Sequence, residues 1–320
     1  MMNCELFIEH EGVLYQPLTL EGITWSTERK SSPGQLNFKV VKDSVLNFEE
    51  GDAVILKYGG IDVFYGFVFT KKRNKDQVID VTAYDQLRYL KNKDTYCYEN
   101  KTASEFIKAV AQLHNLKVGN IEDTKYRIPS RVEKNVTLFD MIENALDLTL
   151  MNKTEMYIMY DDFGKITLKG LESMKLDLMI DEETAEDFDY QSTIDSNTYN
   201  KVRLAYEKEN SNTIEVYEAK DTSHINKWGL LQYFDTLKEG ENGKAKAEAL
   251  LSLYNSKTRT LSIKNALADI RVRAGSLIVV HLNIGDVILQ NYMLVEKCKH
   301  TFNGSQHIMD LTVRGGEFIA

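Results

Sequence analysis

A pattern of three strand-like runs occurs twice in this chain, and the two copies lie more than 200 positions apart. The C-terminal copy lies within Ala274–Val313, and the N-terminal copy lies within Gly51–Thr82. Three pairs of segments correspond in chain order: Gly51–Leu56 with Gly275–Val280, Phe64–Val68 with Asn291–Val295, and Val78–Thr82 with Ile308–Thr312. A distant duplicate of this kind can determine the architecture of a whole chain. The sequence therefore predicts two copies of one β meander.

The last two runs of the C-terminal copy, which begin at Asp286 and Ser305, are separated by Asn303–Gly304. Asn-Gly between alternating apolar runs is the strongest short-range indication of a two-residue hairpin turn. With that turn, Phe302 faces Ser305 and His300 faces His307 across the ladder. Two imidazoles in this position could share a metal ion.

A metal site at His300 and His307 needs at least a third ligand, for which His281 and Asp310 are candidates. Two ligands without a third are common by chance, because histidines often lie half-exposed near a hairpin tip. The sequence therefore favours two structural histidines, and we expect no metal or cofactor.

Composition indicates a globular protein with buried cores, at 43% hydrophobic and 27% charged residues, and a length of 320 residues suggests two or three domains. No apolar run approaches the roughly 20 residues of a membrane helix, and the first residues do not read as a signal peptide. Three scattered cysteines predict synthesis in a reducing cytoplasm. A net charge of −9 disfavours nucleic-acid recognition. Two charge runs, basic Lys71–Lys75 and acidic Asp181–Asp189, are expected to be a solvated hairpin loop and a solvated linker.

The order of patterns divides the chain into three parts. Residues 1–95 read as strands of a small barrel or sandwich, and residues 181–320 return to β. Residues 96–180 form an α+β insert with two helices, each preceded by a threonine cap: Thr102 with Glu105, and Thr137 with Asp140. The expected fold class is β-rich α+β.

A search for catalytic patterns finds no metalloprotease, nucleophile-elbow or dinucleotide motif. Cys97 and His114 could form a thiol nucleophile pair, but no third group is evident to orient the imidazole. Asp221 and His224 could form an acid–base pair, although a capped turn is the favoured interpretation. No catalytic residue is predicted.

Five segments together resemble a known family: Lys101–Val118, Val136–Gly170, Asn197–Val202, Val295–Phe302 and His307–Val313. Their order, a β unit, a two-helix insert and a second β unit with a late helix, is similar to the late control protein D family of phage tails. The resemblance is closer to the XkdQ-type hub proteins of phage-like tail particles. It covers nearly the whole chain, through patterns of segments and not through short fixed signatures.

The resemblance implies two tail-tube-like β-barrels per chain, in 1–95 and 181–320, with 96–180 between them. It also implies a homotrimer whose six barrels join a six-fold tail tube to a three-fold central spike in a contractile baseplate. The expected partners are further copies, the tube protein, the spike and other baseplate proteins, with no nucleic-acid recognition and no membrane insertion. The family has no catalytic residues to carry over.

Two other functions are weighed against the hub. A cell-wall hydrolase is possible for a tail-tip protein, but it requires a metal or nucleophile motif that the sequence lacks. A receptor- or glycan-binding module requires aromatic clusters on loops, whereas Tyr and Phe are spread through the strands here.

Overall fold

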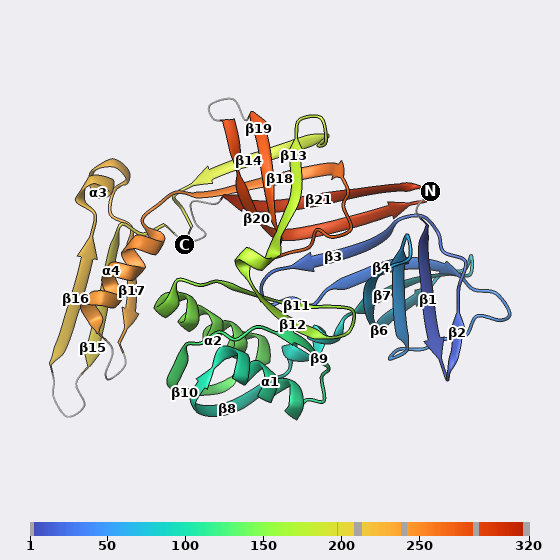
Figure 1. Cartoon of the computed structure of the whole chain (residues 1–320), viewed down its shortest axis with the longest axis horizontal. Helices are drawn as coiled ribbons and strands as arrows, with labels where there is room; N and C mark the ends of the chain where they lie inside the picture. The colour runs from blue at the N-terminus through green and yellow to red at the C-terminus, as the bar shows by residue number, and fades with distance from the viewer. Residues whose placement is uncertain (1–2, 197, 208–212, 238–241, 284–287, 316–320) are drawn as a thin grey trace. The chain divides into compact units, whose positions relative to one another are not determined.

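The computed structural model describes residues 3–196, 198–207, 213–237, 242–283 and 288–315 (Figure 1). Contacts divide the chain into two compact units, one within residues 1–189 and 262–319 and the other within 190–261. Strands predominate and helices are few in the described part, as the sequence predicts. Asn197 and the predicted strand start at Asp286 lie outside the described residues.

The first repeat occupies the N-terminal part of the larger unit, and its strands pair in the order β3-β4-β7-β6-β5-β1-β2 (Figure 1). The bounds are β1 (Cys4–His10), β2 (Val13–Tyr15), β3 (Ile23–Glu28), β4 (Gln35–Val41), β5 (Ala53–Tyr58), β6 (Ile61–Arg73) and β7 (Val78–Tyr84). All these neighbours are antiparallel. On β4 the alternating residues Leu36, Phe38 and Val40 are buried, as in a strand that turns one face to the core.

The second repeat pairs its strands in the equivalent order, β14-β18-β21-β20-β19-β13. The bounds are β13 (Lys175–Asp181), β14 (Asp187–Thr193), β18 (Thr258–Leu267), β19 (Leu277–Asn283), β20 (Ile288–Asn303) and β21 (Gln306–Gly315). Strands β14 and β18 run across the boundary between the two units. One orientation differs, because β1 is antiparallel to β5 whereas β13 is parallel to β19.

The two meanders have the same pattern of backbone hydrogen bonds. Gly51 N donates to Val68 O (2.8 Å) and Gly275 N donates to Val295 O (2.7 Å). Each valine N donates back to the residue after the glycine, at 2.9 Å in both copies. Both glycines have positive φ, +98° and +94°, and the ladder to the next strand shifts register directly after each valine. The duplicated meander predicted from the sequence is confirmed.

The insert follows the first repeat and carries two small sheets, β10-β8 and β11-β12-β9, beside its helices. Its elements are η1 (Gln86–Lys91), β8 (Lys93–Thr102), α1 (Ala103–Leu113), β9 (Val118–Ile121), β10 (Arg127–Thr137), α2 (Leu138–Lys153), β11 (Tyr157–Asp161), β12 (Ile166–Gly170) and η2 (Leu171–Met174). Both predicted capping boxes form, at Thr102 with Glu105 and at Thr137 with Asp140. Each box satisfies backbone N–H groups that a helix start leaves without partners.

The smaller unit is a sheet of order β16-β15-β17 packed against a helix. Its elements are β15 (Lys201–Glu207), β16 (Ile214–Lys220), α3 (Thr222–Trp228), β17 (Gln232–Thr236) and α4 (Gly243–Tyr254). Val202 and Leu204 of β15 and Ala247 and Leu250 of α4 form its core. Helix α4 is the late helix that the sequence predicts in the second β unit.

The structure differs from the sequence-based expectation at the acidic segment and in the closure of the sheet. The acidic side chains of Asp181–Asp189 other than Asp181 are exposed, as predicted, but the segment is not a linker. Asp181 Oδ1 accepts from Glu183 N (3.2 Å) and Thr184 N (3.0 Å), which forms a tight turn between β13 and β14. The strand path runs open from β14 to β2, so the described residues form no closed barrel. Every helix in the described part is too short or too polar to cross a bilayer.

Candidate functional site

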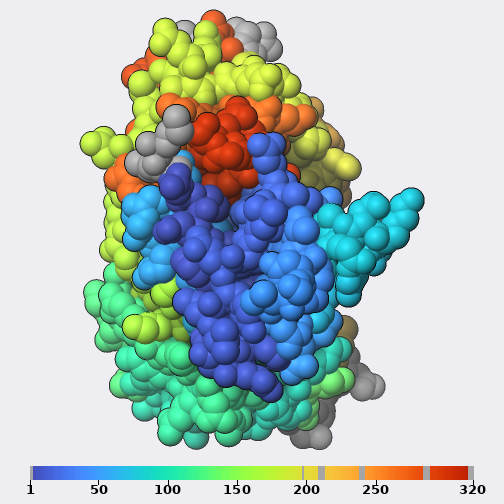
Figure 2. Space-filling view, turned by 90° about the vertical axis from the view of Figure 1, so that its right-hand side faces the viewer, coloured from blue at the N-terminus to red at the C-terminus, as the bar shows by residue number. Residues whose placement is uncertain are grey.

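The first and second repeats meet where β20 pairs with β3. The pairing is antiparallel and runs from Lys297 opposite Glu28 to Phe302 opposite Ile23. Strand β20 has 16 residues, so its first half pairs with β19 and its second half pairs with β3. Figure 2 shows the N-terminal strands (blue) and C-terminal strands (red) side by side on one face. We call this β3–β20 contact the seam.

An ion pair closes one end of the seam. Arg29 Nε donates to Glu296 Oε2 (2.7 Å) and Arg29 Nη2 donates to Glu296 Oε1 (3.0 Å), so the pair is bidentate. The side chains are 10% and 22% exposed, which limits screening by water. Arg29 N also donates to Glu296 O (3.0 Å). The seam is therefore held by charge as well as by the ladder.

The inner face of the seam is buried. Cys298, His300 and Phe302 alternate along β20 and are each at most 2% exposed. His300 stacks on Trp25 of β3, with ring centroids 5.1 Å apart. Burial of these side chains supplies the apolar part of the contact between the two repeats.

The hairpin register differs from the sequence prediction by two residues. Asn303 pairs with Gln306, so the turn is Gly304–Ser305, and Phe302 pairs with His307. His300 therefore faces Met309 and does not face His307 directly. Gly304 adopts φ +55° as the first turn residue, and this placement lets His307 stack on Phe302 at 4.4 Å. The ring contact accounts for the shift.

His300 and His307 still meet diagonally in a hydrogen-bonded chain. Because the Val272 carbonyl can only accept, His300 Nε2 carries a proton and donates to it (2.8 Å). His300 Nδ1 then accepts from His307 Nε2 (2.9 Å). Burial lowers the pKa of both histidines to about 4, so both rings are neutral near pH 7. Beside them, burial raises the pKa of the Cys298 thiol.

The other metal candidates do not join this pair. His281 lies on β19 opposite Gln290, and Asp310 accepts from Asn265 N (3.1 Å). Within the described ranges, no three His, Cys, Asp or Glu side chains are grouped to hold a metal ion. Both ring nitrogens of His300 already have hydrogen-bond partners, so the two histidines have a structural role.

A second buried polar cluster brings together residues from three parts of the chain. The Arg273 guanidinium lies 4.1 Å from the Tyr160 ring centroid and 5.7 Å from that of Trp25, and donates to Asp161 O (2.8 Å). Burial raises the pKa of Asp161 to about 6. Burial, followed by repulsion from Asp161, raises the pKa of Asp85 well above its ordinary value. Sequence reasoning missed this cluster, because nothing local relates its members.

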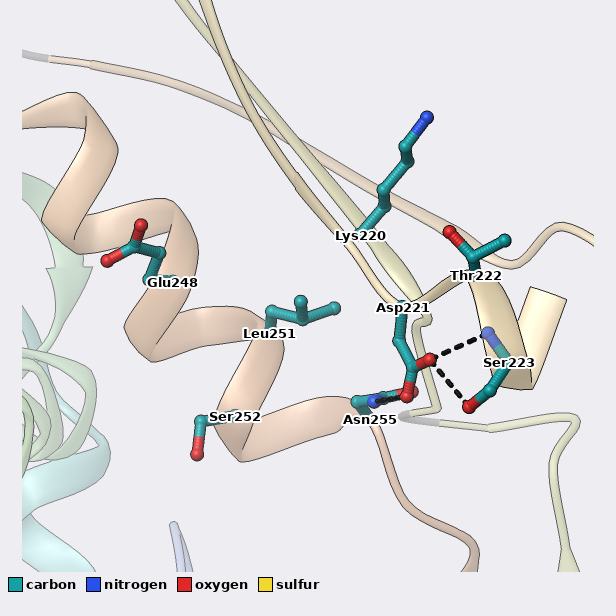
Figure 3. A pocket seen from close by; sticks show the side chains of 8 residues that line it. All are labelled: Lys220, Asp221, Thr222, Ser223, Glu248, Leu251, Ser252 and Asn255. Atoms are coloured by element: carbon teal, nitrogen blue, oxygen red, sulfur yellow. Dashed lines mark hydrogen bonds between the residues drawn. The ribbon is translucent and has the colours of Figure 1, made fainter.

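The Asp221–His224 candidate is a helix cap in the smaller unit. Asp221 Oδ1 accepts from Ser223 N (2.8 Å) and Oγ (2.7 Å), and Oδ2 accepts from Asn255 Nδ2 (2.7 Å). Figure 3 shows these contacts at the edge of an open pocket between α3 and α4. The hydrogen bonds, that from Asn255 first, lower the pKa of Asp221. His224 bonds to Asn255 Oδ1 (2.7 Å) and stacks on Trp228, so the capped turn is confirmed.

The Cys97–His114 candidate is not assembled. Cys97 is exposed on β8, opposite Val132. His114 is the C-cap of α1; its Nε2 lies 3.9 Å from Asp94 Oδ2 and has no hydrogen-bond partner among the described residues. A thiolate–imidazole pair needs a hydrogen bond between the two groups, and none forms here.

Comparison with known proteins identifies the relatives of this fold. A family profile described as YQBQ-like matches residues 23–314. YqbQ of Bacillus subtilis strain 168 is 30% identical over 319 residues, covering 97% of this chain and 96% of YqbQ. The phage-like element PBSX protein XkdQ of the same bacterium is 28% identical over 306 residues, covering 92% of each chain. The crystal structure of the 43 kDa tail protein of prophage MuSo2 from Shewanella oneidensis superposes with TM-score 0.74 at 13% identity, covering 99% and 100%. The resemblance to the XkdQ type is confirmed.

Proposed function

Because the chain belongs to the YQBQ-like family, we propose that it is a structural hub protein of a contractile phage tail or phage-tail-like particle baseplate. The observation that carries this proposal is the duplicated meander, with the same backbone hydrogen bonds at Gly51 and Gly275. Its relative XkdQ belongs by name to a phage-like element, and the chain itself has the fold of a prophage tail protein. The chain is made in the bacterial cytoplasm and acts in the assembled particle.

The proposed assembly is a homotrimeric ring. Each chain contributes two similar repeats, one within 1–95 and one within 181–320, so three chains supply six. Each repeat takes the place of one tube-like barrel in the ring, although its own sheet is open, and the insert 96–180 lies between the two repeats along the chain. A ring of this kind presents six similar units to a six-fold tail tube while keeping three-fold symmetry toward a central spike. The seam shows that two units of one chain can share a sheet.

The proposal assigns no catalysis to the chain. The groups that sequence patterns offered for chemistry have structural partners: Asp221 caps α3, and His300 bonds to Val272 and His307. The alternative is a cell-wall hydrolase of the tail tip. A turbidity assay on purified cell walls separates the two, because clearing that is lost on replacing a single Asp, Glu or His would favour the hydrolase.

The hub is tested by measuring mass in solution. Light scattering of the purified chain, alone and with its tube and spike proteins, is expected to give a trimer that binds both. A chain that stays monomeric and binds neither protein contradicts the hub, whereas a trimer that binds only one restricts it to one face.

A further inference from the structure

The insert meets both repeats at one place in the larger unit. Asp85, the N-cap of η1, accepts from Gly34 N directly before β4 (2.8 Å). Asp161, the last residue of β11, provides the carbonyl to which Arg273 donates (2.8 Å). Arg273 belongs to the second repeat, in the segment before β19. We call Asp85, Asp161 and Arg273 the joint, because they bring together the first repeat, the insert and the second repeat.

The charges of the joint do not balance. Asp85 and Asp161 are 4% and 5% exposed, so two carboxyl groups are buried beside the single positive charge of Arg273. The nearby Gln86 amide donates to Lys117 O (3.0 Å). Asp161 Oδ2 and Arg273 Nε are buried and have no hydrogen-bond partner among the described residues. Buried polar atoms are normally paired, and exceptions often mark strain or a functional group. One proton shared by the two carboxyl groups brings the net charge of the joint to zero.

The turn after Asp161 is strained. Phe163 and Gly164, at its centre, have φ of +48° and +79°, and the left-handed region is unfavourable for a bulky side chain. Asp161 Oδ1 accepts from Gly164 N (2.6 Å), and the Phe163 ring packs on Tyr65 of β6 with centroids 5.7 Å apart. Strain of this kind persists only while the surrounding contacts hold the backbone. The turn therefore relaxes when the joint loosens.

A proton favours the closed joint. Burial raises the pKa of Asp161 to about 6, and burial followed by repulsion from Asp161 raises the pKa of Asp85. When the joint opens, water reaches the carboxyl groups and their pKa returns to about 4. The closed joint thus binds the proton more tightly than the open joint. This advantage of the closed joint is complete below about pH 4 and is lost as the pH rises through about 6.

Further titratable groups face the joint from β11, its turn and β20: Tyr160, Asp162, Cys298 and His300. Burial lowers the pKa of His300 to about 4 and raises the pKa of Cys298, so both side chains stay neutral between pH 5 and 8. Asp162 is exposed, which makes it a control for the two buried carboxyl groups. The range from pH 5 to 8 therefore suits a test of Asp85 and Asp161.

We propose that the joint is a proton-dependent switch, which holds the insert against both repeats while Asp85 and Asp161 share a proton and opens the turn between β11 and β12 when that proton leaves. The proton passes to solvent, only an O–H bond is broken, and the joint keeps one net negative charge. The switch involves contacts within a single chain, so it is independent of the proposed ring. The competing explanation is a static polar cluster whose opening does not depend on pH.

Hydrogen exchange read by mass spectrometry tests the switch on peptides that span residues 157–170. After correction for the intrinsic effect of pH on exchange, opening of the unaltered chain is expected to increase about tenfold from pH 5 to pH 8, because Asp161 has a pKa of about 6 when closed and an ordinary one when open. Asp161→Asn is expected to remove most of this increase, because one carboxylate then faces one guanidinium. Asp162→Asn removes an exposed charge one position away and is expected to keep the increase.

Tryptophan fluorescence gives a second measurement. Trp25 is 4% exposed and its ring centroid lies 5.7 Å from the Arg273 guanidinium, and Trp228 is the other tryptophan of the chain. In a Trp228→Phe background, the emission of Trp25 is expected to shift to longer wavelength as the pH rises through about 6. Asp161→Asn is expected to abolish this shift.

The outcomes decide between a switch and a static cluster. Exchange of residues 157–170 that is equal at pH 5 and pH 8 in the unaltered chain overturns the switch. An increase that Asp161→Asn and Asp162→Asn retain equally also overturns it, and so does an increase spread evenly over the whole chain. Should Asp161→Asn fail to fold, as judged by circular dichroism, Asp85→Asn replaces it, and the pH profile of the unaltered chain still decides.

Discussion

The first and second repeats use one backbone plan for different purposes. Their meanders share the glycine with positive φ, the hydrogen bonds to a valine and the register shift after it. After that shift they diverge, because β20 continues into a buried strand contact and β6 continues into an exposed basic turn. Backbone hydrogen bonds set the shape of each repeat, whereas the side chains after the register shift determine what each repeat can contact.

Alternation explains the divergence. Along β20 the residues that face β3 and its core are Cys298, His300 and Phe302, which need burial. Along β6 the corresponding side chains include half-buried Lys71, whose ammonium donates to Phe48 O, and exposed Arg73. Lysine and arginine on a strand edge oppose unwanted pairing with another strand.

The largest expected effect comes from the two equivalent glycines. A Cβ at Gly275 would overlap Ile158 Cγ2, whereas a Cβ at Gly51 would meet nothing within 4 Å, and both positions have positive φ. Gly275→Ala combines backbone strain with overpacking and is expected to cost about 4 kcal/mol of unfolding free energy. Gly51→Ala is expected to cost only the strain, about 1–2 kcal/mol. Urea denaturation measures both, and equal losses would show that the two sites are not distinguished by packing.

The next effect is the pH dependence of the seam histidines. Their folded pKa of about 4 lies below the ordinary value of 6.5, so unfolded chains bind more protons between these values. Stability from this pair is complete above pH 6.5 and is lost as the pH falls toward 4, by about 3 kcal/mol for each histidine. Asp161, with its pKa raised to about 6, acts in the opposite direction, so the difference between variants is the informative quantity.

His300→Gln is therefore compared with Lys72→Gln on the matching edge of β6. The first is expected to remove the share of the acid-dependent loss between pH 6.5 and 4 that His300 contributes, about half, because His307 remains. It also lowers stability at neutral pH. The second is expected to leave the pH slope unchanged, since Lys72 is exposed on β6. Denaturation curves across the pH range give the slopes, and a slope that His300→Gln leaves unchanged would assign the pH dependence to other groups.

The smallest effect concerns the ion pair at the end of the seam. Glu296→Gln removes one charge from the bidentate contact with Arg29 and is expected to cost about 1–2 kcal/mol. In the first repeat Phe69 occupies the position of Glu296, so that repeat has no equivalent ion pair. Lys72→Ala, further along β6, should therefore change the unfolding free energy by less than about 0.5 kcal/mol. Thermal or urea unfolding of the monomer checks both. Comparable losses at the two edges would mean that the β6 edge is already engaged within one molecule.

Local patterns predicted local structure well. The capping boxes at Thr102 and Thr137 formed because a helix start has few other ways to satisfy its first N–H groups. The repeated meander was recognisable because alternation with a period of two reports which face of a strand is buried. The family resemblance rested on the order of such segments.

Tertiary contacts explain what sequence reasoning missed. The turn at Gly304–Ser305 depends on stacking between Phe302 and His307, which an Asn-Gly rule does not consider. The acidic segment forms a turn because Asp181 accepts from backbone N–H groups that follow it. The cluster of Asp85, Asp161 and Arg273 forms only when distant parts of the chain pack together.

The seam has a consequence for how the polypeptide is made. Arg29 and Glu296 are 267 positions apart, so β3 is translated long before its partner strand. At about 5–20 residues per second, a ribosome leaves the edge of β3 bare for roughly 15–50 s. During that time the nascent chain exposes an adhesive edge next to an unfinished core. Prematurely terminated products that lack the last two strands are thus expected to aggregate, and protection by a chaperone during synthesis should raise the yield of intact protein.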